Sequence, residues 1–305
     1  MPAPPCFFLN RGIERGSSAS DLPEGFDPSR QTPFVAKCAP TILLAGDIAS
    51  TYPELMSSTE NVFLPGVPKV QILERLAASP GNEIASGKLL SPISSAALAV
   101  NCIGWFIEQA SLFPAFPGME DLFPAEAVDV EFQARFPWRG GHHPWLDGVV
   151  VTNSHLIGIE SKRYEPFRDA KTASFSDAYD RPVWEGLESF AALKDALRAG
   201  DVKYEHLDAA QLIKHALGLS TEASRRNLKP ALVYLYAEPG DLLASDKGRD
   251  AIARHRTEIS DFSERVSTAR IPFWATSYKD WLSSWPTESP SLQEHAQNIS
   301  SAFKL

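Results

Sequence analysis

Residues 145–163, WLDGVVVTNSHLIGIESKR, carry three charged side chains at the ends of two apolar runs: Asp147 in the first run, and Glu160 and Lys162 in the second. The polar Thr-Asn-Ser-His between the runs predicts a β-hairpin. A turn centred on its Asn-Ser pair places Asp147 opposite Glu160 across the two strands. Side chains alternate along a strand, so Lys162 projects from the same face as Glu160. The hairpin therefore gathers two carboxylates and an ammonium at its open end.

Two opposed carboxylates beside an ammonium form a set suited to metal-assisted hydrolysis. Like charges placed opposite each other destabilise a sheet, and the pair would raise the pKa of one carboxyl sharply. A divalent cation between them removes that cost, and a ligand set made only of oxygen favours Mg²⁺ or Mn²⁺ over zinc. The ammonium of Lys162 could hold or deprotonate a water beside the metal, or contact a phosphate oxygen. The pattern thus predicts attack on a phosphodiester.

The same residues allow a simpler interpretation. An acid-x-Lys triplet is short and common, and a surface ion pair between Glu160 and Lys162 at a strand end would contribute little to stability. A second triplet at residues 201–203, Asp-Val-Lys, has no partner carboxylate in strand register. We interpret that second triplet as a solvated loop between helices.

The rest of the sequence supplies elements that would position the hairpin. Apolar residues alternate in VDVEFQARF, which predicts a strand over residues 127–135 with Val128, Val130, Phe132 and Ala134 on one face. ALVYLYAEP and IPFWATSY are typical of further strands. Helical spacing predicts helices over residues 67–78, 94–112, 183–200, 206–217 and 246–266, with a short helix at KDWLSSW. This order predicts an α/β fold with a mixed central β-sheet flanked by helices.

Composition limits the class of protein. The chain has 305 residues and 44% hydrophobic content, enough for a sizeable core. Residues 1–65 are rich in Pro, Ser and Gly and predict an N-terminal arm or capping segment before a domain over residues 66–305. We find no signal peptide and no apolar run long enough to span a bilayer, and three cysteines without a metal-binding pattern favour a cytoplasmic location. The net charge of −9 argues against a protein that coats nucleic acid, although an enzyme needs only a local basic patch.

At these residues the sequence resembles the PD-(D/E)xK nuclease superfamily, which has the restriction-endonuclease-like fold. In that family a helix precedes a three-stranded meander, with one acid at the start of the second strand and (D/E)-x-K on the third. The resemblance covers about residues 94–280. It is closest to a group of little-described bacterial members, which share stretches similar to SSAALAVN, EFQARFP, IESKRYEP, DAAQLIKHALGL and LVYLYAEP. It implies a restriction-endonuclease-like core and a hydrolase that cuts nucleic acid.

The resemblance also implies roles for the hairpin residues. Asp147 and Glu160 match the metal-binding acids, and Lys162 matches the catalytic lysine. Leu146 stands where the family pattern has a proline before the first acid, a change that removes no metal ligand.

Further residues enter through the same resemblance. Gln211 occupies the place of a glutamine that exonuclease-like members carry on the helix after the third strand, and Lys214 lies one turn along. A further glutamate often assists the metal, and here Glu131 and Glu108 compete, with Glu131 preferred.

The implied cofactor is Mg²⁺ or Mn²⁺, and the implied partner is nucleic acid, with DNA expected ahead of RNA and no membrane involved. The alternative is a catalytically inactive nuclease-fold domain that binds nucleic acid or a protein partner, because one fold can host both.

Other residues near the hairpin could contact such a substrate. Trp138, Trp145 and Trp184 could stack bases, although core packing is the better explanation for at least two of them. A local basic patch could be formed by Arg135, Arg139, Lys162, Arg163 and Arg168, although a solvated rim explains these residues equally well.

Overall fold

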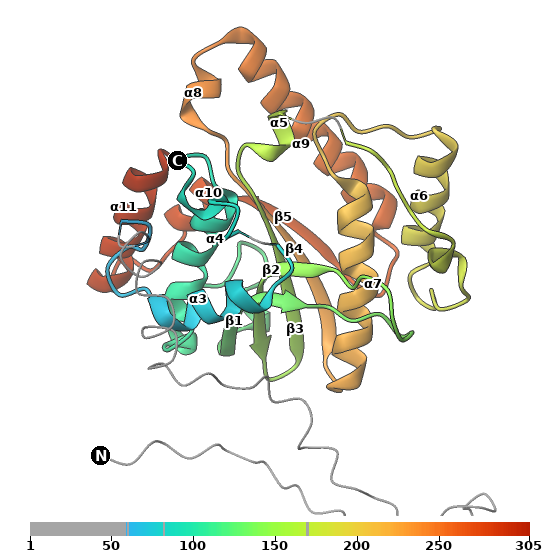
Figure 1. Ribbon diagram of the computed structural model, residues 1–305, viewed down its shortest axis with the longest axis horizontal. Helices are drawn as coiled ribbons and strands as arrows, with labels where there is room; N and C mark the ends of the chain where they lie inside the picture. Colours follow the sequence, from blue (N-terminus) through green and yellow to red (C-terminus); the bar gives the residue numbers. More distant parts are fainter. Residues whose placement is uncertain (1–58, 60, 82, 169–170) are drawn as a thin grey trace, which may run out of the picture. The chain divides into compact units, whose positions relative to one another are not determined.

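The protein, described here from a computed structural model, is built around a five-stranded sheet covered by helices on both faces (Figure 1). The structure describes residue 59 and residues 61–81, 83–168 and 171–305. The strand order is β1-β2-β3-β4-β5; β1, β2 and β3 are antiparallel neighbours, whereas β3, β4 and β5 run parallel. The strands are β1 Ala125–Gln133, β2 Trp145–Thr152, β3 His155–Lys162, β4 Lys229–Tyr236 and β5 Phe273–Ser277. The expected α/β fold with a mixed, helix-flanked sheet is confirmed. Most of the expected arm lies outside the described residues, so the division at residue 65 stays a prediction.

The hairpin of β2 and β3 has the expected register. Val151 pairs with Leu156 and Gly148 with Ile159, the pairing that a turn centred on the Asn-Ser pair requires. The Thr152 hydroxyl accepts two backbone N–H groups of the turn, which fixes its conformation.

Helical connections make the second half of the sheet parallel. β3 is followed by α6 (Glu188–Ala199) and α7 (Ala209–Arg225) before β4, and β4 by α9 (Asp246–Val266) before β5. α6 ends as expected at Gly200, whose φ of 81° suits a glycine at a helix C-terminus.

One face of the sheet is covered by α3 (Lys69–Ala78), α4 (Ser95–Cys102), α10 (Tyr278–Ser283) and α11 (Pro290–Phe303). We call the apolar cluster on this face the first core. Gly104 lies in it at a close approach, because a Cβ there would sit 2.6 Å from Cδ1 of Ile72.

The other face is covered by α6, α7 and α9, and its apolar cluster is the second core. α7 lies against the chain that follows β1: a Cβ at Gly218 would lie 2.3 Å from the carbonyl oxygen of Ala134. This contact brings α7 close to the hairpin.

Two expected helices have different lengths in the structure. The run at residues 94–112 forms only α4 and then short 3-10 turns, because a run that is apolar on all sides has no periodicity to mark its end. α7 continues past Gly218, because this glycine serves a close packing contact inside the helix.

α11 was not expected. The short elements are α5 Glu165–Arg168, α8 Gly240–Leu243, η3 Lys88–Leu90, η4 Gly104–Phe106, η5 Ala110–Leu112, η6 Glu120–Leu122 and η7 Asp177–Asp180. Within the described ranges, no helix has the length and apolar character needed to cross a membrane.

Candidate active site

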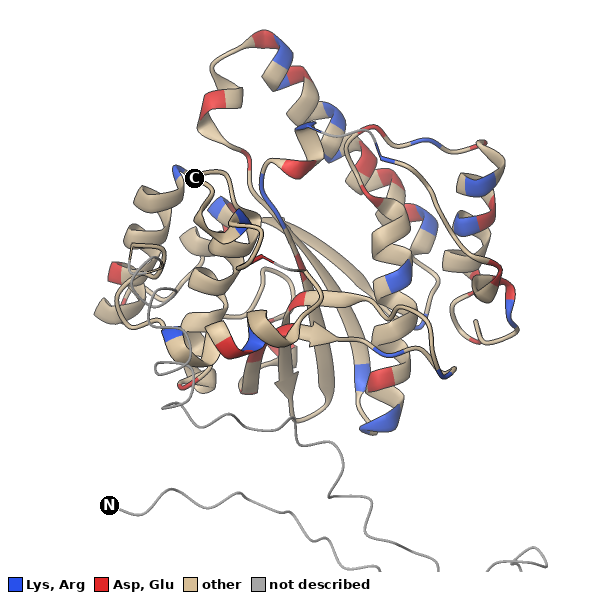
Figure 2. Cartoon of the chain, viewed as in Figure 1, with Lys and Arg blue, Asp and Glu red and all other residues tan. Residues whose placement is uncertain are grey.

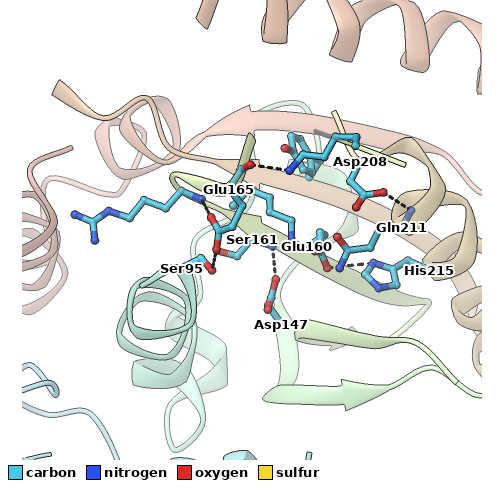
Figure 3. A network of polar contacts seen from close by, with 12 residues as sticks. Ser95, Asp147, Glu160, Ser161, Glu165, Asp208, Gln211 and His215 are labelled. Atoms are coloured by element: carbon cyan, nitrogen blue, oxygen red, sulfur yellow. Dashed lines mark hydrogen bonds and ion pairs between the residues drawn. The ribbon is translucent and has the colours of Figure 1, made fainter. Parts of the chain in front are cut away.

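β2 and β3 separate at the end of the hairpin, and Asp147 lies at the point of separation. The last ladder pair is Gly148 with Ile159, so the ladder stops just before Asp147 would pair with Glu160. The N–H of Ser161 instead donates to Oδ2 of Asp147 at 2.6 Å (Figure 3). The Asp147 carboxylate thus accepts a hydrogen bond from the backbone of β3, which holds it beside that strand.

β1 breaks its alternation at Glu131. Val130 packs in the first core and Phe132 against the second, although residues two apart on a regular strand share a face. The expectation that both lie on one face was therefore wrong. Glu131 has a φ of 54°, in the left-handed region, and the strand turns over there. The ladder pairs on either side place Glu131 across from Asp147. Such a conformation costs about 1–2 kcal/mol outside glycine, and residues that adopt it concentrate at functional sites.

Glu160 lies between Lys162 and a histidine of α7. Nζ of Lys162 pairs with Oε1 of Glu160, and Nδ1 of His215 lies 3.1 Å from Oε2 (Figure 3). Glu160 is 1% exposed and His215 2%. Within the described part of the chain, neither Oε2 nor Nδ1 has a hydrogen bond of good geometry, so the 3.1 Å contact is one of ion-pair distance only. The Glu160 side chain is 2% exposed and that of Lys162 16%, so this pair is not the surface ion pair of the simpler interpretation.

These charges shift one another's pKa values. Burial raises the pKa of the half-buried Asp147 well above its ordinary range, and the Glu160 carboxylate raises it further while Lys162 opposes both. Burial would also raise the pKa of Glu160, but Lys162 and His215 lower it to about 2. Burial would lower the pKa of Lys162, but Glu160 and Asp147 raise it above its ordinary value. Glu160 and Lys162 are therefore charged at neutral pH, whereas burial and the Glu160 charge disfavour the ionised form of Asp147.

Of the two competing glutamates, Glu131 lies with these acids. Burial raises the pKa of Glu131 to about 7; a contact with Ser79 opposes this, and the Glu160 charge adds to it. Glu108 is exposed and accepts a hydrogen bond from Nε2 of Gln71 at 2.8 Å, in a separate surface contact.

Two further carboxylates near Lys162 were missed by the sequence interpretation. Glu165 accepts hydrogen bonds from the Ser95 hydroxyl and from the N–H of Arg163. Burial would raise the pKa of Glu165, but the Ser95 hydrogen bond and the charge of Lys162 lower it. Burial raises the pKa of Glu83, and the Glu165 charge adds to this while nearby lysines oppose it. Glu165 follows the end of β3, where strand alternation no longer indicates direction.

α7 presents Gln211 and His215 to the site. Asp208 caps this helix by accepting the Gln211 N–H at 2.9 Å. Gln211, Lys214 and His215 line one side of a hollow of about 410 Å³, and Trp145 lines another side. His215 was missed by the sequence interpretation, although its i,i+4 spacing from Gln211 places both on one helix face.

The donor atoms suit a hard divalent cation. Among the described residues, no three His, Cys, Asp or Glu side chains come together as a complete metal site. Mg²⁺, however, is commonly held by one or two carboxylates, with water and substrate phosphate as the other ligands. Asp147 and Glu160 supply two carboxylates, and Oε2 of Glu160 is buried with hydrogen-bonding capacity left over. The residues present therefore fit Mg²⁺ or Mn²⁺.

Two of the residues expected in a basic patch are engaged in contacts within the protein. Arg163 is buried, and its guanidinium donates to two backbone carbonyl oxygens at 2.8 and 2.6 Å, so its assignment to a basic patch was wrong. Arg135 is half-exposed and pairs with Glu222. Basic and acidic residues are interspersed over the helices (Figure 2). The charged residues of the second triplet, 201–203, are exposed.

Comparison with known proteins identifies the family. A family model described as "Restriction Endonuclease associating with ARP" matches residues 69–301, a range that contains every strand and site residue described above. The searches of curated proteins and of solved structures gave no match. The chain therefore belongs to this restriction-endonuclease-like family, REase-ARP.

Proposed function

We propose that this protein is a metal-dependent nuclease, a hydrolase that cleaves phosphodiester bonds of nucleic acid, with DNA as the first candidate. The main support is the meeting of Asp147, Glu160 and Lys162 where β2 and β3 separate. Membership of a restriction-endonuclease-like family supports the same class of reaction. A cytoplasmic location stays a prediction from the sequence.

Asp147 and Glu160 would hold Mg²⁺ or Mn²⁺, and Glu131 would stand as a third acid nearby. The metal, when bound, supplies charge neutralisation at the phosphate and lowers the pKa of a water. His215 would keep the Glu160 carboxylate in place through the contact at 3.1 Å. In the reaction a water oxygen forms a bond to phosphorus while the bond from phosphorus to the leaving oxygen breaks; the water gives up a proton to solvent, and the leaving oxygen takes one from solvent.

Lys162 acts in this proposal as a charged hydrogen-bond donor. Its pKa is raised by the neighbouring carboxylates, so it holds its proton at neutral pH and is a poor base. It can orient the attacking water or stabilise charge on a phosphate oxygen. Gln211, on the wall of the adjoining hollow, would support the lysine or a phosphate through its neutral amide.

The experiment is cleavage of single-stranded and duplex DNA and of RNA by purified protein with Mg²⁺, Mn²⁺ or EDTA. We expect cleavage that needs the metal and falls at least about 100-fold in Asp147→Asn and in Lys162→Ala. Lys229→Ala is the matched control, because Lys229 is exposed at the opposite end of the same sheet.

Asp147→Asn separates a catalytic role from a structural one. The substitution removes a carboxylate that its neighbours repel, so we expect the metal-free variant to be at least as stable as the wild type. Loss of cleavage together with undiminished stability would support an active site. Full activity in Asp147→Asn would overturn the assignment of Asp147 to the active site. Binding of nucleic acid without cleavage under every metal condition would favour the inactive binding domain.

A further inference from the structure

Trp145 separates two hollows beside the proposed active site. The larger hollow, about 410 Å³, extends to α7 and is also lined by Gln211 and Lys214. The smaller, about 260 Å³, lies toward the loop after β1 and is also lined by His142 and His143. Trp145 belongs to both linings, so this residue lies where the two hollows meet.

Trp145 differs from the other two tryptophans near the hairpin. The Trp138 ring stacks on Phe136 with centroids 4.5 Å apart, and the Arg181 guanidinium lies 4.9 Å from its centroid. Trp184 is 9% exposed and packs in the second core. Trp145 is partly exposed, and within the described part of the chain no aromatic ring or cation packs against it. Its indole is therefore available to a ligand.

The position of Trp145 relative to Asp147 suggests what that ligand is. The two residues are two positions apart on β2, about 7 Å along the strand. We propose that Trp145 stacks an unpaired nucleobase of the substrate strand, next to the phosphate that is cleaved. This inference rests on the proposed nuclease function and narrows its substrate to a single strand, because a base inside a duplex has both faces covered by its neighbours.

Each hollow has a cation near it that can contact a phosphate, although each cation also has a carboxylate nearby: Asp208 lines the larger hollow together with Lys214, and Arg135 pairs with Glu222. Near the smaller one, burial and then the charge of Arg135 lower the pKa of His143, which shows that Arg135 is close. Asp208 also lines the larger hollow, but its Oδ1 accepts the capping N–H of α7. With a net charge of −9 for the whole chain, binding depends on these local cations and on stacking.

The first experiment measures binding of labelled single-stranded oligonucleotides, oligo-dT and oligo-U in separate arms, by fluorescence anisotropy in EDTA. We expect Trp145→Ala to weaken binding about 5- to 150-fold and Trp145→Phe to restore most of it. Trp274→Phe is the matched control: Trp274 is also partly exposed but lies on β5, at the far edge of the sheet. A duplex without unpaired bases should bind the wild type more weakly than the single strand.

The second experiment moves one abasic site along the oligonucleotide. We expect one position at which the missing base weakens binding to the wild type but has no further effect in Trp145→Ala. The abasic scan changes the oligonucleotide and not the protein, so its result for the wild type does not depend on whether Trp145→Ala folds. A flat scan, equal binding of Trp145→Ala, or a duplex bound as tightly as the single strand would overturn the inference. Because binding is measured without metal, the stacking by Trp145 can be confirmed even if no cleavage is found. Metal-dependent cleavage together with a flat abasic scan would support the nuclease function and overturn the stacking.

Discussion

The partly buried carboxyl of Glu131 makes the stability of the metal-free protein depend on pH. Its pKa is about 7 in the folded chain against an ordinary 4.5, because burial and the nearby Glu83 and Glu160 disfavour its charged form. The folded chain therefore binds this proton more tightly than the unfolded chain does. Below about pH 4.5 the carboxyl is protonated in both the folded and the unfolded chain, so it does not lower the free energy of unfolding. As pH rises above 4.5, the free energy of unfolding falls, and it stops falling once the folded carboxyl has ionised above about pH 7.

The size of the effect follows from the two pKa values. Each tenfold difference in proton affinity corresponds to about 1.4 kcal/mol, which gives an upper limit of about 2.5 kcal/mol lost between pH 5 and pH 8. Glu131 is partly exposed, so solvent screening lowers the expected loss to about 1–2 kcal/mol.

The assay is urea unfolding in EDTA at about pH 5 and about pH 8 for the wild type, Glu131→Gln and Glu126→Gln. Glu126 is the matched control, because it is exposed on the same strand. We expect Glu131→Gln to lose about 1–2 kcal/mol less between the two pH values than the other two proteins. The same loss in all three would show that Glu131 is not held in the charged surroundings described, and its place in the proposed site would fall with it.

Three further changes test other contacts. His215→Phe removes the Nδ1 contact to Glu160, and we expect at least about 5-fold weaker Mn²⁺ binding by calorimetry, with partial recovery in His215→Gln and an unchanged circular dichroism spectrum. Gly218→Ala would place a methyl group 2.3 Å from a backbone carbonyl oxygen, and the free energy of unfolding in urea should fall by about 1–3 kcal/mol; wild-type stability would contradict the close approach of α7. Burial lowers the pKa of His255 to about 3, so stability is lost as pH falls below the ordinary 6.5. His255→Gln should lose about 2 kcal/mol less than the wild type between pH 7 and pH 5, whereas the exposed His142→Gln should match the wild type.

The hairpin was predictable because its signals are local. Alternation in two adjacent runs and a polar turn fix which residues pair, and the pairs from Val151–Leu156 to Gly148–Ile159 follow. The mixed topology of the sheet was also predictable, because helices between the later strands allow those strands to run parallel.

The features missed depend on packing between distant segments. Glu131 adopts its left-handed conformation where β1 passes from the first core to the second, and a strand sequence does not reveal on which core each residue packs. His215 reaches Glu160 because α7 lies close to the sheet at Gly218, a contact with the chain after β1. The length of α4 was missed because its apolar sequence fits a buried helix and buried turns equally well.

The balance of charge in the site distinguishes an active site from a structural ion pair. A pair that serves only stability is neutral, as one lysine with one buried carboxylate would be. Here the single positive charge of Lys162 lies near three carboxylates, those of Glu160, Asp147 and Glu165. Glu131 adds a fourth from the neighbouring strand β1, where it lies opposite Asp147. Burial is the main cause of the raised pKa values of Asp147 and Glu131, and the charge of the neighbouring carboxylates adds to it. A divalent cation supplies positive charge and displaces the protons. Metal binding should therefore release protons and tighten as pH rises through 7, and calorimetry of Mn²⁺ binding in buffers of different ionisation enthalpy measures this release. Binding without proton release would mean that the metal is held elsewhere.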